Sequence, residues 1–295
     1  MQLSEILLAR ARVQSNVTHS SQNETEPSLA PGKSQEVCKS MIRLIERKDH
    51  YAVGEAAAKW VISEVRDKPK SDICLAAGCT HVLMCSMLVD MSVAHQVSFG
   101  ECTFFAMDEY LGLERDSPYS LHHMLEQSFV SRIGTDKARF KYLDSVPCGP
   151  EAEAVRYERE IAESGGLDLA ISGIGTNGHI GFNEPGSVFN SRTRVVNLTR
   201  ETIEQNACQF PSAHKLPTRA LTSGIGTLLQ AKKMLLLASG KNKARPLYDA
   251  LMSSPRVEIP ASALQLHPDT TTIADSESLE HAESEAPDGS PSACG

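Results

Sequence analysis

The chain has 295 residues, of which 41% are hydrophobic and 22% charged, and its formal net charge is -8 at pH 7. This composition is that of an ordinary globular protein and predicts one large domain with loosely held ends. The negative charge and the lack of a basic cluster argue against nucleic acid and anionic membranes as partners. No stretch approaches the roughly 20 apolar residues that a membrane span requires.

Along the chain the expected elements alternate between helix and strand. Apolar residues at three- and four-residue spacing predict helices, and short continuous apolar runs predict buried strands. The helices are expected over 34–48, 52–67, 81–92, 150–165 and 243–252. The strands are expected over 72–78, 102–107, 167–175 and 233–240. This alternation predicts an α/β fold, Rossmann-like and three-layered, with a mostly parallel central sheet and helices on both faces.

The composition divides the chain into three expected parts: a flexible N-terminal extension over 1–33, a single α/β domain over 34–274 and a disordered acidic tail over 275–295. The tail carries six acidic residues and no Lys or Arg. Eight cysteines are scattered without CxxC or zinc-ligand spacing, which is typical of reduced thiols. Because the apolar N-terminal stretch is too short for a targeting peptide and Glu5 interrupts it, we expect a cytoplasmic protein.

In open α/β sheets ligands bind beyond the carboxyl ends of the strands, so the residues that follow each strand are the first candidates for a site. One such segment is "AAGCTH", residues 76–81, between an expected strand and a helix. Gly78 permits a tight turn, Thr80 can cap the helix, and the unpaired N–H groups of a helix start attract phosphate. The same residues are also common at strand-to-helix turns that bind nothing.

Two acidic residues, Asp108 and Glu109, directly follow the expected strand over 102–107. Adjacent residues point in different directions, so we expect at most one to face a cleft, while the other contacts solvent or a partner. Lys243 begins the expected helix over 243–252. A lysine at that position opposes the helix dipole unless an anion lies between them, which favours a phosphate site.

The densest polar motif is "GIGTNGHIGFNEPG", residues 173–186, with five glycines. So many glycines indicate either turns with positive φ or backbone that approaches a ligand closely. His179 can change its charge near neutral pH, and the nearby Glu184 can fix its tautomer and raise its basicity. A capping or core histidine is the alternative. The four segments together favour a site for a phosphorylated small molecule, with Asp108 and His179 as proton-transfer groups.

Several long motifs resemble, in order and spacing, the glucosamine-6-phosphate deaminase (isomerase) family over residues 50–274. They are "FFAMDEYLGL", "GIGTNGHIGFNEPG", "SRTRVVNLT", "ALTSGIGTLLQAKKMLLLASGKNKA" and "LQLHP". The resemblance implies conversion of glucosamine 6-phosphate and water to fructose 6-phosphate and ammonia, without a metal or organic cofactor. It also implies that the protein can form a homo-oligomer.

The resemblance also implies roles for single residues. Asp108 moves a proton between two sugar carbons, His179 helps to open the pyranose ring, and Glu184 supports His179. The phosphate is held by a loop and a lysine, here Gly78, Cys79, Thr80 and Lys243.

The chain departs from the family pattern at several positions. Asn177 stands where the common pattern has an aspartate, and an amide cannot supply the negative charge that would raise the pKa of His179. Cys208 stands where the family has an arginine, and Arg219 is the nearest candidate to replace that phosphate donor. The phosphate loop ends in a histidine where the family favours proline, and Ala77 lacks a hydroxyl.

Three further functions stay open. Asn177 resembles the galactosamine-6-phosphate branch, whose product is tagatose 6-phosphate. A 6-phosphogluconolactonase has a similar fold and phosphate loop but typically reads DER where this chain has Asp108, Glu109 and Tyr110. A non-catalytic sugar-phosphate sensor would fit the altered phosphate loop, although Asp108, His179 and Glu184 argue against it.

Overall fold

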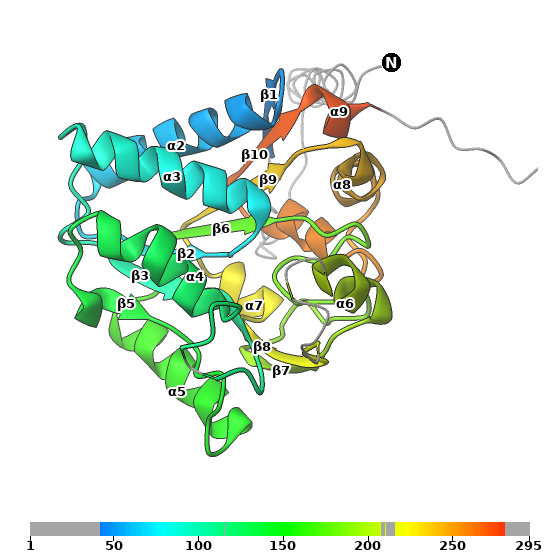
Figure 1. Ribbon diagram of the computed structural model, residues 1–295. Coiled ribbons are helices and arrows are strands. Elements are labelled where there is room, and N and C mark those ends of the chain that lie inside the picture. The colour runs from blue at the N-terminus through cyan, green and yellow to red at the C-terminus, as the bar shows by residue number, and fades with distance from the viewer. Residues whose placement is uncertain (1–41, 115, 208–209, 211–215, 281–295) are drawn as a thin grey trace, which may run out of the picture.

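A seven-stranded parallel sheet forms the centre of the molecule (Figure 1). The computed structural model describes residues 42–114, 116–207, 210 and 216–280. From one edge of the sheet to the other the strands are β1 (Arg43–Arg47), β10 (Thr270–Asp275), β9 (Lys233–Ala238), β6 (Leu169–Gly173), β2 (Asp72–Leu75), β3 (Thr103–Ala106) and β5 (Phe140–Lys141). All six pairings between neighbours are parallel, which confirms the predicted fold class.

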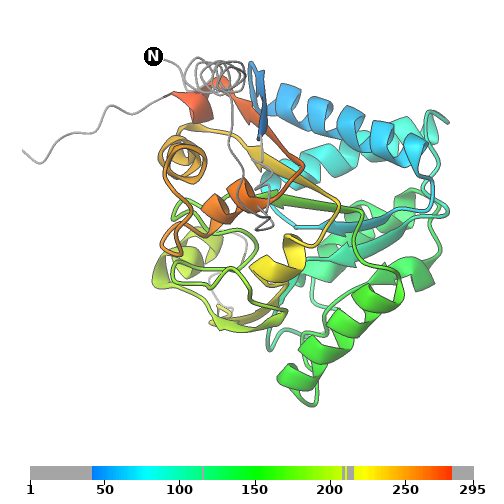
Figure 2. The same ribbon diagram turned by 180° about the vertical axis from the view of Figure 1, so that it is seen from behind.

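Helices cover both faces of this sheet because its strands are apolar on both sides. Along β2, Ile73 and Leu75 pack on one face, whereas Cys74 packs on the other, as the alternation of a strand requires. The first face is covered by α2 (His50–Asp67), α3 (Cys79–Val93) and α4 (Leu121–Ser128). The second is covered by α5 (Pro150–Glu163), α8 (Ala244–Met252) and the 3-10 helix η5 (Pro260–Leu266), as Figure 2 shows from behind.

A second, antiparallel sheet of three strands lies beside the first and was not predicted. Its strands, in order, are β4 (Asp108–Tyr110), β8 (Arg219–Thr222) and β7 (Arg194–Asn197). The β4 strand follows β3 after the single residue Met107, so the chain passes directly from one sheet into the other. The short helices α6 (Arg200–Asn206) and α7 (Ile225–Leu228) flank β7 and β8 in the chain. Asp108 is therefore held in a ladder, opposite Thr222, and not in a turn.

The structure corrects the expected elements near both ends of the domain. The helix expected over 34–48 is wrong over its second half, where β1 pairs in parallel with β10. Residues 42–47 contain both helical and strand periodicity, and the open edge of β10 selects the strand. The disordered tail expected over 275–295 is wrong at its start, because β10 includes Asp275 and α9 (Ser276–Leu279) follows it. The extension over 1–33, the first part of the expected helix (34–41) and residues 281–295 lie outside the described residues.

The chain reverses direction across the sheet between β2 and β6. From β2 the strands β3 and β5 build outward to one edge, and the chain then returns through α5 to place β6 on the other side of β2. Loops at such a reversal part from one another at the carboxyl ends of the strands and leave a crevice. The remaining short 3-10 segments are η1 (Val130–Arg132), η2 (Lys137–Arg139) and η4 (Lys241–Lys243). Within the described residues, no helix has the length and apolar character to cross a membrane.

Candidate active site

A pocket of about 500 Å³ opens at this reversal point. Its walls come from the segments that follow β2, β6 and β9 and from β4 of the smaller sheet. Five residues predicted from the sequence line it, namely Gly78, Thr80, Asp108, His179 and Lys243. The structure thus brings together segments that lie more than 160 residues apart in the chain.

The predicted phosphate loop forms one wall. Gly78 is the N-cap of the 15-residue helix α3, with extended backbone and no side-chain cap, and Cys79 is the first helical residue. The prediction that Thr80 caps this helix is therefore wrong, because Thr80 lies inside its first turn. The first N–H groups of a helix have no partner within the helix, so the pocket adjoins a helix start that can accept an anion. Lys243, the N-cap residue of α8, lines the same pocket.

The glycine-rich stretch forms turns and lines the site at the same time. Gly175 donates its N–H to the carbonyl of His179 at 2.9 Å, and Gly178 has a φ of +84°. A Cβ on Gly175 would lie 2.3 Å from the His179 ring, so only glycine lets the imidazole fold over the backbone. Gly181 has a φ of +56°, and a Cβ there would lie 3.4 Å from a carboxylate oxygen of Asp108.

Asp108 is a buried carboxylate at the pocket wall, with 6% of its surface exposed. Burial, and next the negative charge of Glu109, raise its pKa to about 7. A carboxylate buried in this way favours the protonated form because water no longer solvates the charge. A group that titrates near neutral pH can both accept and return a proton, as general acid–base catalysis requires.

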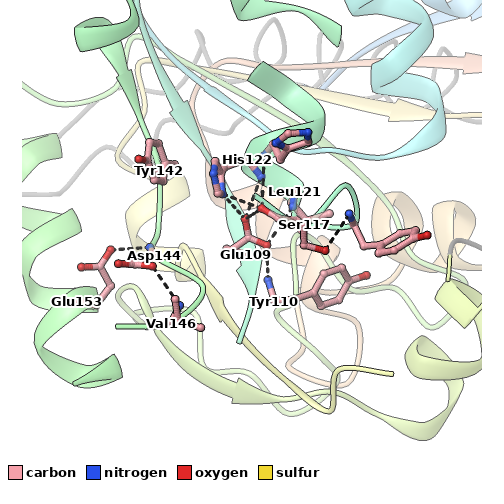
Figure 3. A network of polar contacts seen from close by, with 12 residues as sticks. Glu109, Tyr110, Ser117, Leu121, His122, Tyr142, Asp144, Val146 and Glu153 are labelled. Carbon is pink, nitrogen blue, oxygen red and sulfur yellow. Dashed lines mark hydrogen bonds and ion pairs between the residues drawn. The ribbon is translucent and has the colours of Figure 1, made fainter. Parts of the chain in front are cut away.

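Glu109 does not line the pocket, and its side chain lies in a buried network of polar contacts (Figure 3). Its carboxylate accepts backbone N–H groups of Tyr110, Leu121 and His122 at 2.8, 3.0 and 3.0 Å. The Ser120 hydroxyl donates to it at 2.7 Å, and the His122 Nδ1 lies 2.9 Å away.

This network replaces the solvent or partner contact predicted for Glu109. Its carboxylate sits at the N-terminus of α4, where the helix dipole stabilises negative charge. The His122 ring in turn stacks on Tyr142, with centroids 4.3 Å apart. Glu109 therefore fixes β4 to α4 directly beside Asp108.

His179 is supported by the two residues that the sequence singled out. Its Nδ1 lies 3.5 Å from a carboxylate oxygen of Glu184, close enough for an ion pair but outside hydrogen-bond geometry. Asn177 bridges the two, since its amide donates to Glu184 at 2.8 Å and its oxygen accepts the backbone N–H of His179 at 3.1 Å.

The environment of Glu184 favours its ionised form. Burial acts to raise the pKa of this carboxyl, but contacts with His179, Thr202 and Asn177 outweigh burial and lower the pKa to about 2. The backbone N–H of Thr199 also donates to it, at 3.2 Å. Asn177 thus works through the carboxylate of Glu184 and contributes an amide donor in place of a second negative charge.

The structure also places residues that the sequence analysis assigned wrongly or missed. Arg219 is exposed at the start of β8 and does not line the pocket, so its predicted role as a phosphate donor is not supported. Cys208 lies outside the described residues. Missed residues that line the pocket include His50, whose Nδ1 lies 3.1 Å from the Ser239 hydroxyl, and His81 in α3. The segment "AAGCTH" ends in His81, but helix periodicity alone could not show its direction.

No group of three or more His, Cys, Asp or Glu side chains that could hold a metal ion occurs within the part of the chain that the structure describes.

Comparisons with known proteins place the chain in a family of enzymes that act on sugar phosphates. Residues 48–273 match the model of glucosamine-6-phosphate isomerases/6-phosphogluconolactonase, and the chain belongs to this family. A glucosamine-6-phosphate deaminase from Thermoanaerobacter pseudethanolicus is 38% identical over 236 residues, which cover 80% of this chain and 93% of the relative. One from Shewanella loihica is 41% identical over 234 residues, covering 79% of this chain and 87% of the relative.

Solved structures agree with this assignment. A monomeric glucosamine-6-phosphate deaminase superposes with a TM-score of 0.78 at 37% identity, covering 80% of this chain and 98% of that one. A 6-phosphogluconolactonase from Trypanosoma cruzi gives a TM-score of 0.66 at 22% identity, covering 82% and 97%. At that identity the second likeness shows the shared fold alone.

Proposed function

We propose that the protein converts glucosamine 6-phosphate and water to fructose 6-phosphate and ammonia. The observation that carries the proposal is that Asp108 and His179 line one pocket together with the phosphate loop of α3 and Lys243. The relatives that share 38–41% identity and most of their length with this chain are glucosamine-6-phosphate deaminases, which supports the same reaction.

In this reaction His179 acts on the ring of the sugar. Opening a cyclic hemiacetal requires a proton at the ring oxygen while another leaves the anomeric hydroxyl. An imidazole can carry a proton in this way because it accepts and donates near neutral pH. Glu184 and Asn177 hold the segment that carries His179 and do not line the pocket themselves.

Asp108 then transfers a proton between two adjacent carbons. As a carboxylate it removes the proton from carbon 2 of the open sugar, and it returns that proton to carbon 1. The carbonyl oxygen of carbon 1 takes up a proton and the amine nitrogen releases one, so the resulting double bond joins carbon 2 to nitrogen. Water then adds to this imine, and ammonia leaves to give the ketone. A pKa of about 7 leaves roughly half of Asp108 ionised at neutral pH, and general acid–base steps of this kind contribute about 10²–10⁴ in rate.

The phosphate holds the sugar in register with both groups. Gly78, Cys79 and Thr80 at the start of α3 present a helix N-terminus, and Lys243, which lines the same pocket, supplies a positive charge. Anchoring a remote group in this way places the reacting carbons against Asp108 and converts binding energy into positioning.

Ammonia release measured with a coupled assay tests the proposal. Glucosamine 6-phosphate, its galacto epimer and 6-phosphogluconolactone are assayed side by side with the wild-type chain and with Asp108→Asn. We expect ammonia from glucosamine 6-phosphate with the wild type and a loss of at least about 10²-fold with the variant. Greater turnover of the galacto epimer would reassign the substrate, and lactone hydrolysis without ammonia would reject the deaminase.

The cellular location and the oligomeric state are further parts of the proposal. Cys74, Cys85, Cys102 and Cys148 are free thiols, which agrees with the predicted cytoplasmic setting. The homo-oligomer stays a prediction, and the solved relative with 37% identity is a monomer. Light scattering at several protein concentrations measures the assembly directly.

A further inference from the structure

His81 lines the pocket, and its ring has no hydrogen-bond partner within the part of the chain that the structure describes. It is the third residue of α3, and only 2% of its surface is exposed. The ring fits between the phosphate loop and the end of β6. A Cβ on Gly78 would lie 3.2 Å from its Nδ1, and one on Gly173 would lie 3.1 Å from its Cε1.

Neither ring nitrogen of His81 has a hydrogen-bond partner among the described residues. Buried polar side chains in native proteins almost always have one, so the unpaired imidazole of His81 in the pocket lining is a candidate to bind a polar ligand in the pocket. By contrast, the buried His267 has its Nε2 2.7 Å from the carbonyl oxygen of Ala231, as expected for a structural histidine.

Without a ligand His81 is neutral. Burial lowers its pKa to about 4, and the nearby carbonyl groups of Ile171 and Ser172 oppose this shift without reaching hydrogen-bond geometry. A protonated ring would have two N–H donors, one for a carbonyl of β6 and one for an anion in the pocket. A dianion beside the ring would therefore favour its protonated form.

Among the titratable residues that line the pocket, His81 is the one that lies in the first turn of α3, where an anion is favoured. From the elements packed against α3, the titratable residue that lines the pocket is His50 of α2. The other titratable residues that line the pocket are Asp108 and Tyr110 of β4, His179 after β6 and Lys243 of η4. His81 belongs to the same first turn of α3 as Thr80, the helix start where an anion is favoured.

We propose that His81 is a substrate-binding residue that donates a ring N–H to the phosphate group held at the start of α3. The inference rests on the proposed function only in taking a sugar phosphate as the ligand. Binding of the phosphate and uptake of a proton by His81 are coupled, because the ring is neutral before binding and pairs with the anion afterwards.

Two substitutions separate the loss of the hydrogen-bond donor at His81 from the loss of its titratable proton. His81→Leu removes the donor, and His81→Gln keeps a donor that cannot titrate. His123→Gln is the matched control, because His123 is on α4 and does not line the pocket. Thermal unfolding without ligand comes first, and we expect the His81 variants to be no less stable than wild type, since the ring forms no hydrogen bond.

Calorimetry with inorganic phosphate at pH 6, in two buffers of different ionisation enthalpy, counts the protons taken up. We expect His81→Leu to weaken phosphate binding by about ten- to a hundredfold, the usual range for a hydrogen bond to a charged group. We expect His81→Gln to bind more tightly than His81→Leu but to take up nearly one proton fewer than wild type. Phosphate titrates itself near this pH, so the difference between variants, and not the total, reports His81.

Kinetics with glucosamine 6-phosphate complete the test. We expect KM to rise in His81→Leu with kcat nearly unchanged, and His123→Gln to match wild type. Equal phosphate affinity and equal proton uptake in wild type and both His81 variants would overturn the inference, even if the wild type releases ammonia. If the wild type releases no ammonia but proton uptake still depends on His81, the proposed reaction fails and the anion site stands.

Discussion

Replacing Asp108 by asparagine should abolish turnover and, at the same time, stabilise the fold at neutral and alkaline pH. The carboxyl has a pKa of about 7 in the folded protein, against 3.8 for an ordinary aspartate, mainly because it is buried and next because Glu109 is negative. The folded protein thus retains a proton that the unfolded chain releases between these two values. Stability therefore falls as pH rises from about 4 to about 7 and is constant above that range.

The size of the effect follows from the two pKa values. Their difference is equivalent to about 4 kcal/mol at pH 8, and it vanishes below pH 4, where both states are protonated. Asparagine removes the charge but leaves a buried amide, so we expect a net gain of between about 1 and 4 kcal/mol at pH 8. No gain of this origin is expected at pH 4.

Urea unfolding of wild type and Asp108→Asn at several values between pH 4 and pH 8 measures this dependence, with ammonia release measured on the same samples. Asp116→Asn, at an exposed position, controls for the loss of one negative charge. A stability difference that does not change with pH would refute the reasoning, because it would show that Asp108 titrates alike in both states.

Three other substitutions probe the surroundings of the two proton-transfer groups. Glu109→Gln removes a negative charge that raises the pKa of Asp108, so the acid limb of the pH profile of kcat/KM should move to lower pH. An unchanged acid limb in a folded variant would show that Glu109 does not affect the pKa of Asp108. Gly181→Ala places a Cβ at positive φ, 3.0 Å from the Thr222 hydroxyl, and should cost roughly 1–3 kcal/mol in urea unfolding as well as reduce kcat. Glu184→Gln removes a carboxylate whose pKa is lowered to about 2. In wild type this carboxylate stabilises the fold above pH 4.5, and that contribution is lost as the pH falls toward 2, so the variant should lack this pH-dependent contribution. A parallel acid-unfolding profile for wild type and Glu184→Gln would show that this carboxylate is not stabilised by the fold.

The helices and strands that bury long apolar runs were predictable from the sequence. Because buried parallel strands are short, continuous and apolar, the strands expected over 72–78, 102–107 and 167–175 contain β2, β3 and β6, although each expected range is longer than the strand itself. Their order in the sheet was not predictable. Only the tertiary structure shows that β6 returns to lie beside β2 and that this reversal opens the pocket.

The local chemistry of the site was also predictable, but its supporting contacts were not. The sequence motifs identified Asp108, His179 and Lys243 as site residues. Their convergence on one pocket follows from the rule that sites form at the carboxyl ends of strands. The directions in which the side chains of Glu109 and Arg219 point depend on the small antiparallel sheet. Its strands of three and four residues are too short to show the alternation of apolar and polar residues that predicts a strand.

The sequence by itself determined the family, the alternation of helix and strand and the residue types at the strand ends, since these depend on local periodicity and on motif order. The tertiary structure decided which of those residues share a cavity and what surrounds each ionisable group. A pKa depends on burial and on charges brought close by chain segments far apart in sequence. For this reason the tertiary fold determines three properties of the site: the unpaired buried ring of His81, the pKa of about 7 of the Asp108 carboxyl and the buried polar contacts of Glu109.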